Sequence, residues 1–530
     1  MKHISLLLAA SSIALAFPTQ VVLDTPNRPR LHGRFLHITD MHPDPYYKAG
    51  ASPSAACHRK MPGKANNAGY YGTPFDECDS PLSLTNFTLD YLQENWSDDI
   101  DFVIWTGDSA RHDNDDDIPR PLDEIYNLNR AVAKRMEQVF SSKGIPVIPT
   151  LGNNDVWRPN DITRTFASIW SNFIPPASEA SYIKGGYYSV EVIPNALAVI
   201  SMNTMYYYDS NKAVKGCPTD DLSDPGNIQF DWLEQQLNTF RSRQMQARMP
   251  VMINHYFHEC YYRYTELSLR FQDTILGHLF GFYFLDADDL FVGLTHEGLV
   301  SGSLFDTLIT DFGALPEEDI NYDHYAVVNV NPSVVPNPYL PSFRVFAYNV
   351  SGIEDTDVGD VGAHAYHRAV QTVRQKRWPH GHGDSGACVG MCECAQQSWR
   401  CKVKQPWHSD DEAPSRRNSL WTPLGYAQYY MRKLGKYNEK KRPAFELEYL
   451  TFSLTRLHGH ESAGGTLIPL KHLPKELHDR SVKKSKFAPY GLEDLTIRSW
   501  VGLGCRLGQE EEKKLRKRFR KYMYMGGEES

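Results

Sequence analysis

Three short apolar runs, each followed at once by a cluster of polar side chains, are the feature of this sequence that most restricts its fold. The runs are 35–39, 102–106 and 147–151, and their length and residue types predict buried strands. The clusters that follow them contain Asp, Asn, His and Gly. Loops at strand ends carry the functional groups of α/β proteins, so the pattern predicts an α/β fold with its site on these three loops.

Two further segments predict amphipathic helices, and the composition then changes toward the C-terminus. Residues 130–142 and 231–243 have apolar positions at helical spacing, which is typical of helices packed on a core. From about residue 352 a Gly-, His- and Cys-containing stretch precedes basic segments, and residues 400–530 hold 27 Lys and Arg against 16 Asp and Glu. We therefore expect a main domain at 33–350 and a Cys-containing, basic C-terminal region at 351–530.

The first 20 residues have the pattern of a secretory signal. Lys2 and His3 precede an apolar stretch at 4–17 that ends among small residues. This stretch is short for a transmembrane helix, but an uncleaved segment of this kind can act as a type II membrane anchor. The sequence has no apolar run of 18 residues and is 41% hydrophobic, which excludes a polytopic membrane protein and a disordered chain.

Glycosylation motifs and cysteines also favour the secretory pathway. Asn86, Asn95 and Asn349 each begin an Asn-X-Ser/Thr motif without Pro in the middle. There are 9 cysteines, and an odd number leaves at least one outside any pairing within the chain. Disulfides are the first interpretation for the clustered cysteines and zinc ligation is the second. The clustered residues are Cys388, Cys392, Cys394 and Cys401.

Each polar cluster offers oxygen or imidazole ligands for a metal ion. Asp40 and His42 follow the first run two residues apart, and in extended backbone such positions share one side. Asp108 follows the second run, directly after a Gly, and Asn153 follows the third run in the same way. Taken singly, these residues fit turns or caps, because Gly, Asn and Asp favour turns. Their order along the chain is what favours a metal site.

This order, with a later His255, resembles the calcineurin-like metallophosphoesterase superfamily. The resemblance implies a four-layered α/β sandwich, with two mixed β-sheets flanked by helices, and two divalent metal ions. It implies that Asp40 and His42 hold the first ion, that Asp108 bridges, and that Asn153 and His255 hold the second. Ligands of these types suit Mn, Co, Zn, Fe or Mg and do not choose among them.

Six longer segments are similar to one branch of that superfamily, the fungal endopolyphosphatases, which are vacuolar relatives of acid sphingomyelinase. The resemblance implies hydrolysis of internal phosphoanhydride bonds of inorganic polyphosphate, in the vacuolar lumen or on a type II membrane anchor. No nucleic-acid partner is predicted. The segments are 35–47, 105–115, 150–155, 267–281, 335–352 and 491–502.

Three residues are candidates for contact with the substrate. Asn154 stands where most metallophosphoesterases have a His that protonates the leaving group, and a phosphate leaving group needs less of that help because it is a weak base. His112 is the candidate for proton donation or phosphate contact. Arg111 can make a bidentate phosphate contact, and the alternative for it is an ion pair with the acidic residues at 113–117.

One part of the family pattern is missing. The resemblance leads us to expect a further Gly-His motif after 277–281, and a longer loop after His255, but neither is found. The deletions either leave a catalytically impaired polyphosphate-binding protein, or arose when the coding sequence was assembled, or are compensated by His258, His278 or His296. A sphingomyelinase-like phosphodiesterase is a further alternative, and His278 fits a packing role better than a ligand role.

Overall fold

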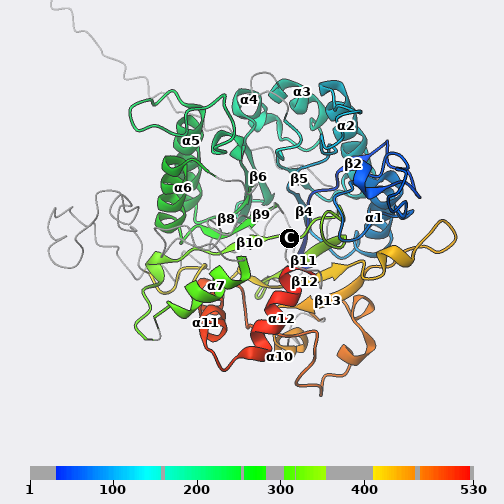
Figure 1. The fold of residues 1–530 in the computed structure, drawn as a ribbon. Coiled ribbons are helices and arrows are strands. Elements are labelled where there is room, and N and C mark those ends of the chain that lie inside the picture. The colour runs from blue at the N-terminus through cyan, green and yellow to red at the C-terminus, as the bar shows by residue number, and fades with distance from the viewer. Residues whose placement is uncertain are drawn as a thin grey trace, which may run out of the picture.

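Two mixed β-sheets form the centre of the molecule, and helices lie on their outer sides (Figure 1). The computed structural model describes residues 31–156, 162–251, 256–281, 304–316, 318–353, 410–459 and 466–525. The expected α/β sandwich of two mixed sheets with flanking helices is therefore confirmed.

The first sheet has six strands and contains all three strands predicted from the apolar runs. The neighbours β1, β4 and β5 are parallel, whereas β11, β12 and β13 extend the sheet on the other side of β1 in antiparallel pairs. Because parallel strands end at the same edge, the three polar clusters lie together. The strand order is β13 (Glu446–Leu450), β12 (Pro423–Tyr430), β11 (Ser342–Tyr348), β1 (Arg34–Ile38), β4 (Phe102–Trp105) and β5 (Val147–Pro149).

The second sheet has five strands and is buried on both faces. Along β7, Leu197 and Val199 belong to the apolar core shared with the first sheet, while Ala198 and Ile200 belong to the core under α5 and α6. This alternation follows from the two-residue period of a strand. The strand order is β10 (Val328–Val330), β9 (Ile275–Phe280), β8 (Gln246–Val251), β7 (Leu197–Ser201) and β6 (Tyr188–Ile193).

Both predicted amphipathic helices are confirmed, and both begin earlier than expected. The first is α2 (Leu122–Val139), which starts after Pro121 and has two acidic residues in its first turn. The second is α5 (Pro225–Ser242), which the Asp224 side chain caps by accepting a hydrogen bond from a backbone N–H. The other helices are α1 (Leu82–Asn95), α3 (Ile162–Ile169), α4 (Pro176–Gly185), α6 (His258–Arg270), α7 (Leu304–Gly313), α10 (Leu454–His458), α11 (Ile497–Gly508) and α12 (Lys513–Met523).

The C-terminal region completes the first sheet, which differs from the division expected at residue 350. Strands β12 and β13 come from the C-terminal region, and β12 pairs with β11 along its length. The change in composition predicted a boundary there, but strand pairing joins segments across it. The cysteine cluster at 388–401 and the N-terminal segment 1–20 lie outside the described residues.

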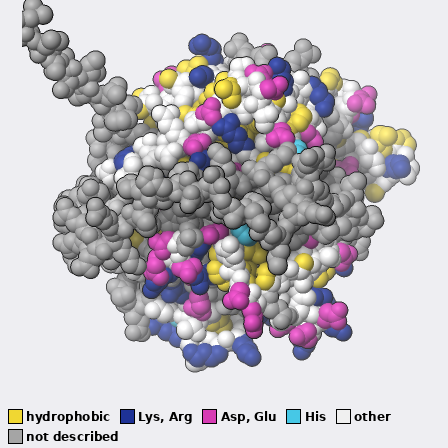
Figure 2. Space-filling view, turned by 90° about the vertical axis from the view of Figure 1, so that its left-hand side faces the viewer, with side chains coloured by type: hydrophobic (Ala, Val, Ile, Leu, Met, Phe, Trp, Pro, Cys, Tyr) yellow, Lys and Arg dark blue, Asp and Glu magenta, His cyan; other side chains and the backbone are white. Residues whose placement is uncertain are grey.

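The described surface mixes charges of both signs. On the face shown in Figure 2, Lys and Arg side chains lie next to Asp and Glu side chains over the lower part of the molecule. Such mixing is typical of solvated helix faces. Among the described helices, none combines the length and the apolar content that crossing a bilayer requires.

Glu448 on β13 predicts that the stability of the fold depends on pH. Its side chain is buried, and Gln428 Nε2 donates a hydrogen bond to its Oε2 (2.7 Å). Burial raises the pKa of Glu448 from 4.5 to about 7, against the opposing effects of that bond and of the charges of Lys521 and Arg344. Since the pKa is higher in the folded state, protonation of Glu448 favours folding. Its contribution to the free energy of unfolding is fully present below about pH 4.5.

We expect that contribution to be lost as the pH rises from 4.5 through 7, on the order of 3 kcal/mol for this one group. Glu448→Gln should therefore flatten the fall in the free energy of unfolding over this range, as measured by urea unfolding at several pH values. Glu446→Gln, on the same strand at a more exposed position, is the control and should keep the wild-type slope. Equal slopes for Glu448→Gln and the wild type would contradict the prediction.

Candidate metal centre

The loops after β1 and β4 are joined by backbone hydrogen bonds. The Asp40 N–H donates to the Gly107 carbonyl (3.2 Å), and the Met41 and His42 N–H groups both donate to the Asp108 carbonyl (3.1 Å each). Asp40, His42 and Asp108 have positive φ angles of 51°, 36° and 54°, which residues with side chains rarely adopt. Strain of this kind persists where the surrounding structure fixes it, and it is common at functional sites.

The two glycines of the predicted pattern allow the loops after β4 and β5 to touch. A Cβ atom on Gly107 would lie 2.4 Å from the Gly152 nitrogen, and one on Gly152 would lie 2.1 Å from Asp108 Oδ1. Any side chain at either position would push the loops apart. The glycines before Asp108 and Asn153 are thus required by this close approach of backbone.

Asp155 holds the same two loops together through its carboxylate, a role that the sequence did not predict. Its Oδ2 accepts from the N–H groups of Asp108 (2.8 Å) and Gly152 (3.0 Å). Its Oδ1 accepts from the Ser109 N–H and from Asn129 Nδ2 (2.9 Å each). The side chain is completely buried, so four buried donors depend on one carboxylate.

The side chains of Asp40, His42 and Asp108 converge. His42 Nε2 lies 3.6 Å from Asp40 Oδ1 and 3.8 Å from Asp108 Oδ2. The other ring nitrogen, Nδ1, lies 2.7 Å from the Ala110 carbonyl, which can only accept a hydrogen bond, so Nδ1 carries the proton. The lone pair of Nε2 therefore faces the two carboxylates, which is the orientation of a metal-ligating histidine.

Two buried oxygen atoms show that this site fits a cation. Among the described residues, Asp108 Oδ2 and Asn153 Oδ1 have no hydrogen-bond partner, although buried acceptors are normally satisfied. Burial raises the pKa of Asp108 to about 7, and the charges of Asp40 and Asp155 act in the same direction. An ionised Asp108 thus needs positive charge close by, which a divalent cation provides.

The protonation of His42 also fits a ligand role. Burial lowers the pKa of His42 below its ordinary value, and the charge of His112 adds to this effect against the opposing charges of Asp108 and Asp79. The lowered pKa favours the neutral imidazole, and only the neutral ring can bind a metal ion.

His112 enters the site from the loop after β4 and is held by Asp79, a residue that the sequence did not single out. The rings of His112 and His42 stack with centroids 4.1 Å apart. Asp79 is buried, whereas 32% of the His112 side chain is exposed, so His112 faces the open side of the site. Burial alone would lower the pKa of His112, but the charge and the hydrogen bond of Asp79 raise it above its ordinary value.

The position of Arg111 differs from both sequence-based interpretations. Its side chain is buried, and its Nε donates to Glu124 Oε1 on α2 (2.5 Å). Its Nη1 and Nη2 donate to the carbonyl groups of His112 (3.1 Å) and Ile118 (2.8 Å). The guanidinium thus lies away from the open side of the site, and its acidic partner is Glu124 and not a residue of 113–117.

Asn154 contributes to the candidate metal site through hydrogen bonds of its backbone. Its N–H donates to Asp108 Oδ1 (2.7 Å), and its carbonyl accepts from Arg120 Nη1 (2.9 Å). The amide oxygen of its side chain lies 3.4 Å from the same Nη1. Arg120 is a buried cation that the sequence did not predict, and its only signal was its place shortly after the acidic residues at 113–117.

The remaining sequence-based candidates lie elsewhere. His255 and His296 are outside the described residues. His278 is buried in β9 with its Nδ1 2.6 Å from Tyr264 Oη, an arrangement typical of a packing histidine. His258 is the first residue of α6, and its Nε2 lies 2.5 Å from Tyr262 Oη.

The three glycosylation candidates lie in described segments. Asn86 is exposed on α1. The side-chain amide groups of Asn95 and Asn349 donate to the Tyr91 carbonyl (2.8 Å) and to Asn418 Oδ1 (2.7 Å).

Comparison with known proteins agrees with this geometry. Residues 33–265 match the family model described as calcineurin-like phosphoesterase, the class of protein that the two-sheet fold and the site define. Proteins of this class hold two metal ions, and the described part of this chain has two groups of residues that can hold an ion. The first group is Asp40, His42 and Asp108. In the second, His42, Asp79 and His112, both oxygen atoms of Asp79 are already hydrogen-bonded to His112.

The relatives identify the family more closely. An endopolyphosphatase of Cryptococcus neoformans is 36% identical over 634 aligned residues, which cover 94% of this chain and 92% of that protein. Endopolyphosphatases of Neurospora crassa and Schizosaccharomyces pombe are both 35% identical, and the matches cover 66% and 63% of this chain and 57% and 64% of those proteins. The chain therefore belongs to the endopolyphosphatase family.

Two further observations come from the comparisons. The alignment with the Cryptococcus protein is longer than the 530 residues of this chain, so that relative contains segments without a counterpart here. A solved structure of a purple acid phosphatase from yellow lupin aligns with 47% of this chain and 37% of its own, at 12% identity and a TM-score of 0.24. A likeness at that level adds nothing to the assignment.

We expect Asp155→Ala to destabilise the protein on the order of 4 kcal/mol, because it leaves three buried N–H groups without an acceptor and removes one of the two acceptors of Asn129 Nδ2. Urea unfolding of the purified variant measures this loss. The control is Asp116→Ala at an exposed position, which should stay within about 0.5 kcal/mol of the wild type. A loss for Asp155→Ala no larger than that of the control would contradict the role of this carboxylate.

Proposed function

We propose that this chain hydrolyses internal phosphoanhydride bonds of inorganic polyphosphate in a reaction that depends on two divalent metal ions. The observation that carries the proposal is the convergence of His42 Nε2 with the carboxylates of Asp40 and Asp108. The Asn153 amide oxygen, on the loop after β5, has no hydrogen-bond partner among the described residues. This site occurs in a chain that an endopolyphosphatase of Cryptococcus neoformans matches over nearly its full length.

The metal ions would be held by hard ligands on the three loops. Asp40 and His42 would bind the first ion, Asp108 would bridge, and Asn153 and His255 would bind the second. Ions bound in this way polarise phosphoryl oxygens and supply hydroxide near neutral pH. The neutral Asn153 limits the negative charge that faces a polyanionic substrate, and the ligand types leave Mn, Co, Zn, Fe and Mg open.

Among the described residues, His112 is the one best placed to contact the substrate. Asp79 occupies its Nδ1, which leaves Nε2 as the ring atom available to a phosphate oxygen. A raised pKa favours the protonated ring, which can donate a hydrogen bond or a proton to the leaving phosphate. Because that leaving group is a weak base, Asn154 in place of a second histidine is compatible with turnover.

We further propose that the protein acts in the vacuole, as a luminal or type II membrane-anchored glycoprotein that arrives through the secretory pathway. The signal-like N-terminus and the three glycosylation motifs support this proposal. Two disulfides, Cys57–Cys78 and Cys217–Cys260, support it as well, because such bonds persist in oxidising compartments.

The proposal is tested on secreted protein with its disulfides formed. We expect two divalent ions per chain by elemental analysis, and shortening of long-chain polyphosphate on gels. Asp108→Ala should lose bound metal and lower kcat about 1,000-fold, because it removes the ligand shared by both ions. The exposed Asp116→Ala is the matched control and should keep metal and activity.

Each other outcome has a defined meaning. Wild-type protein that does not shorten polyphosphate with Mn, Co, Zn or Mg would contradict the proposed activity. A preference for phosphocholine esters over polyphosphate would identify a sphingomyelinase-like phosphodiesterase instead. One bound ion or none, with polyphosphate bound and not cleaved, would identify a binding protein without turnover.

A further inference from the structure

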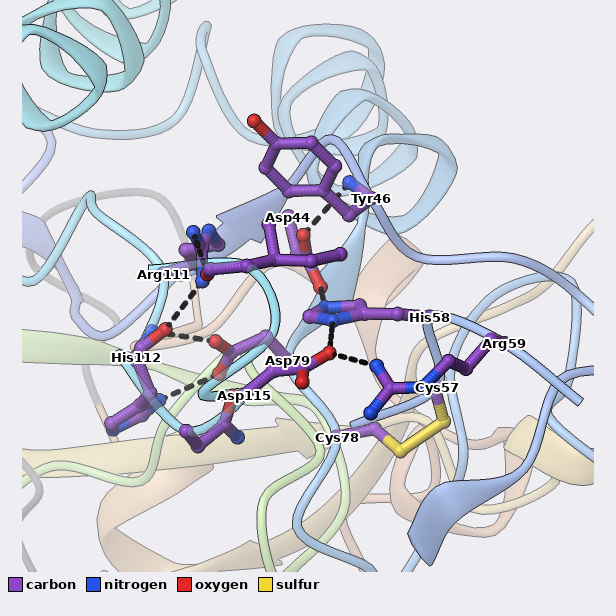
Figure 3. Close-up of polar contacts among 12 residues, drawn as sticks. Asp44, Tyr46, Cys57, His58, Arg59, Cys78, Asp79, Arg111, His112 and Asp115 are labelled. Carbon is purple, nitrogen blue, oxygen red and sulfur yellow. Dashed lines mark hydrogen bonds and ion pairs between the residues drawn. A yellow bond between two sulfur atoms is a disulfide. The ribbon is translucent and has the colours of Figure 1, made fainter. Parts of the chain in front are cut away.

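We propose that Asp79 is the positioning residue for His112, and that the Cys57–Cys78 disulfide holds Asp79 in place. The inference deepens the proposed function and rests on it, because it concerns the imidazole that would face the polyphosphate chain. Asp79 is not one of the proposed metal ligands, and Figure 3 shows it with His112 and the Cys57–Cys78 disulfide.

A single carboxylate fixes both the ring and the backbone of His112. Asp79 Oδ1 lies 2.6 Å from His112 Nδ1, and Asp79 Oδ2 accepts a hydrogen bond from the His112 backbone N–H (2.6 Å). Asp79 is 2% exposed, so water does not compete for these bonds. A carboxylate on Nδ1 sets both the orientation and the tautomer of the ring, and Nε2 is left for the substrate.

The residues on either side of Asp79 tie it to the metal centre. Cys78 precedes it and forms the buried disulfide with Cys57. Ser80 follows it in β3 (Ser80–Pro81), and the Ser80 N–H donates to the His42 carbonyl (3.1 Å) beside β2 (Pro43–Asp44). Asp79 therefore lies between a covalent crosslink and the backbone of a metal-ligand candidate, which sets the position of His112 relative to His42.

The other half of the disulfide carries a second contact to the same loop. His58 follows Cys57, and its Nε2 and Nδ1 lie 2.7 Å from Asp44 Oδ2 and 2.6 Å from Asp115 Oδ2 (Figure 3). Arg59 Nη1 also donates to Asp115 Oδ2 (2.6 Å). The disulfide thus has, directly after each cysteine, a residue that binds the loop of His112.

The loop itself explains why such bracing is needed. Residues 112–117 have the sequence HDNDDD, with no apolar side chain to bury against the core. Four carboxylates in this stretch repel one another, so specific polar contacts must offset the entropy of ordering the loop. Asp79 at one end and His58 near the other supply those contacts.

The test is the isosteric variant Asp79→Asn in the full chain loaded with metal. We expect kcat for polyphosphate shortening to fall about 10- to 100-fold, with KM and the metal content unchanged. The matched control is Glu77→Gln, which removes a charge from an exposed position of the same loop and should leave all three values at wild-type level. An unchanged kcat for Asp79→Asn would overturn the inference.

A double-mutant cycle separates positioning from a general structural effect. If Asp79 acts through His112, then Asp79→Asn should cost nothing further in a His112→Gln background. The same loss of kcat in both backgrounds would overturn the inference. Removing the disulfide with Cys57→Ala and Cys78→Ala should lower kcat in the wild-type background. In the His112→Gln background it should cause no further loss of kcat, as expected for Asp79→Asn.

A measurement that needs no turnover keeps the two proposals distinguishable. The imidazole N–H proton that His112 shares with Asp79 should give a far-downfield NMR resonance that Glu77→Gln keeps and that Asp79→Asn and His112→Gln both lose. A wild-type chain that shows this resonance without cleaving polyphosphate would count against the proposed function alone. A resonance that persists in Asp79→Asn would overturn the positioning role.

Discussion

The buried carboxylate of Asp155 is the interaction on which the geometry of the site depends. It joins the backbone after β4 to the backbone after β5, and both glycine contacts between these loops exist only because the loops are held so close. Once the loops are joined, Asp108 and Asn153 each present an oxygen atom that no donor of the described segments satisfies. The metal-binding character of the site is thus a consequence of how tightly the backbone is packed.

Electrostatics and burial then divide the residues around the site into two roles. Asp40, Asp108 and His42 are buried together, an arrangement of charges that a cation stabilises. Asp79 and His58 are buried as well, but each is paired within the protein through hydrogen bonds of 2.6 to 2.7 Å. The first set is placed to hold a cation, whereas the second set holds the loop of His112.

Much of the fold was predictable from local pattern. The predicted apolar runs form β1, β4 and β5, and the segments with helical periodicity lie in α2 and α5. These elements were predictable because their sequence patterns depend on nearby residues only. The boundary expected at residue 350 followed composition, and it missed the pairing of β12 with β11, which joins residues about 80 positions apart. Pairing at such distances leaves no local signal in one sequence.

Within the site, the sequence alone determined the residue types and their order: Asp40, His42, Asp108 and Asn153, each just beyond a strand that ends at one edge of the sheet. Only the tertiary structure decided their partners. Arg111 is turned into the protein by Glu124, and His112 is oriented by Asp79, which lies 33 residues before it. Ligand positions follow from strand ends, a local property, whereas hydrogen-bond partners and burial depend on which distant segments the folded chain brings together.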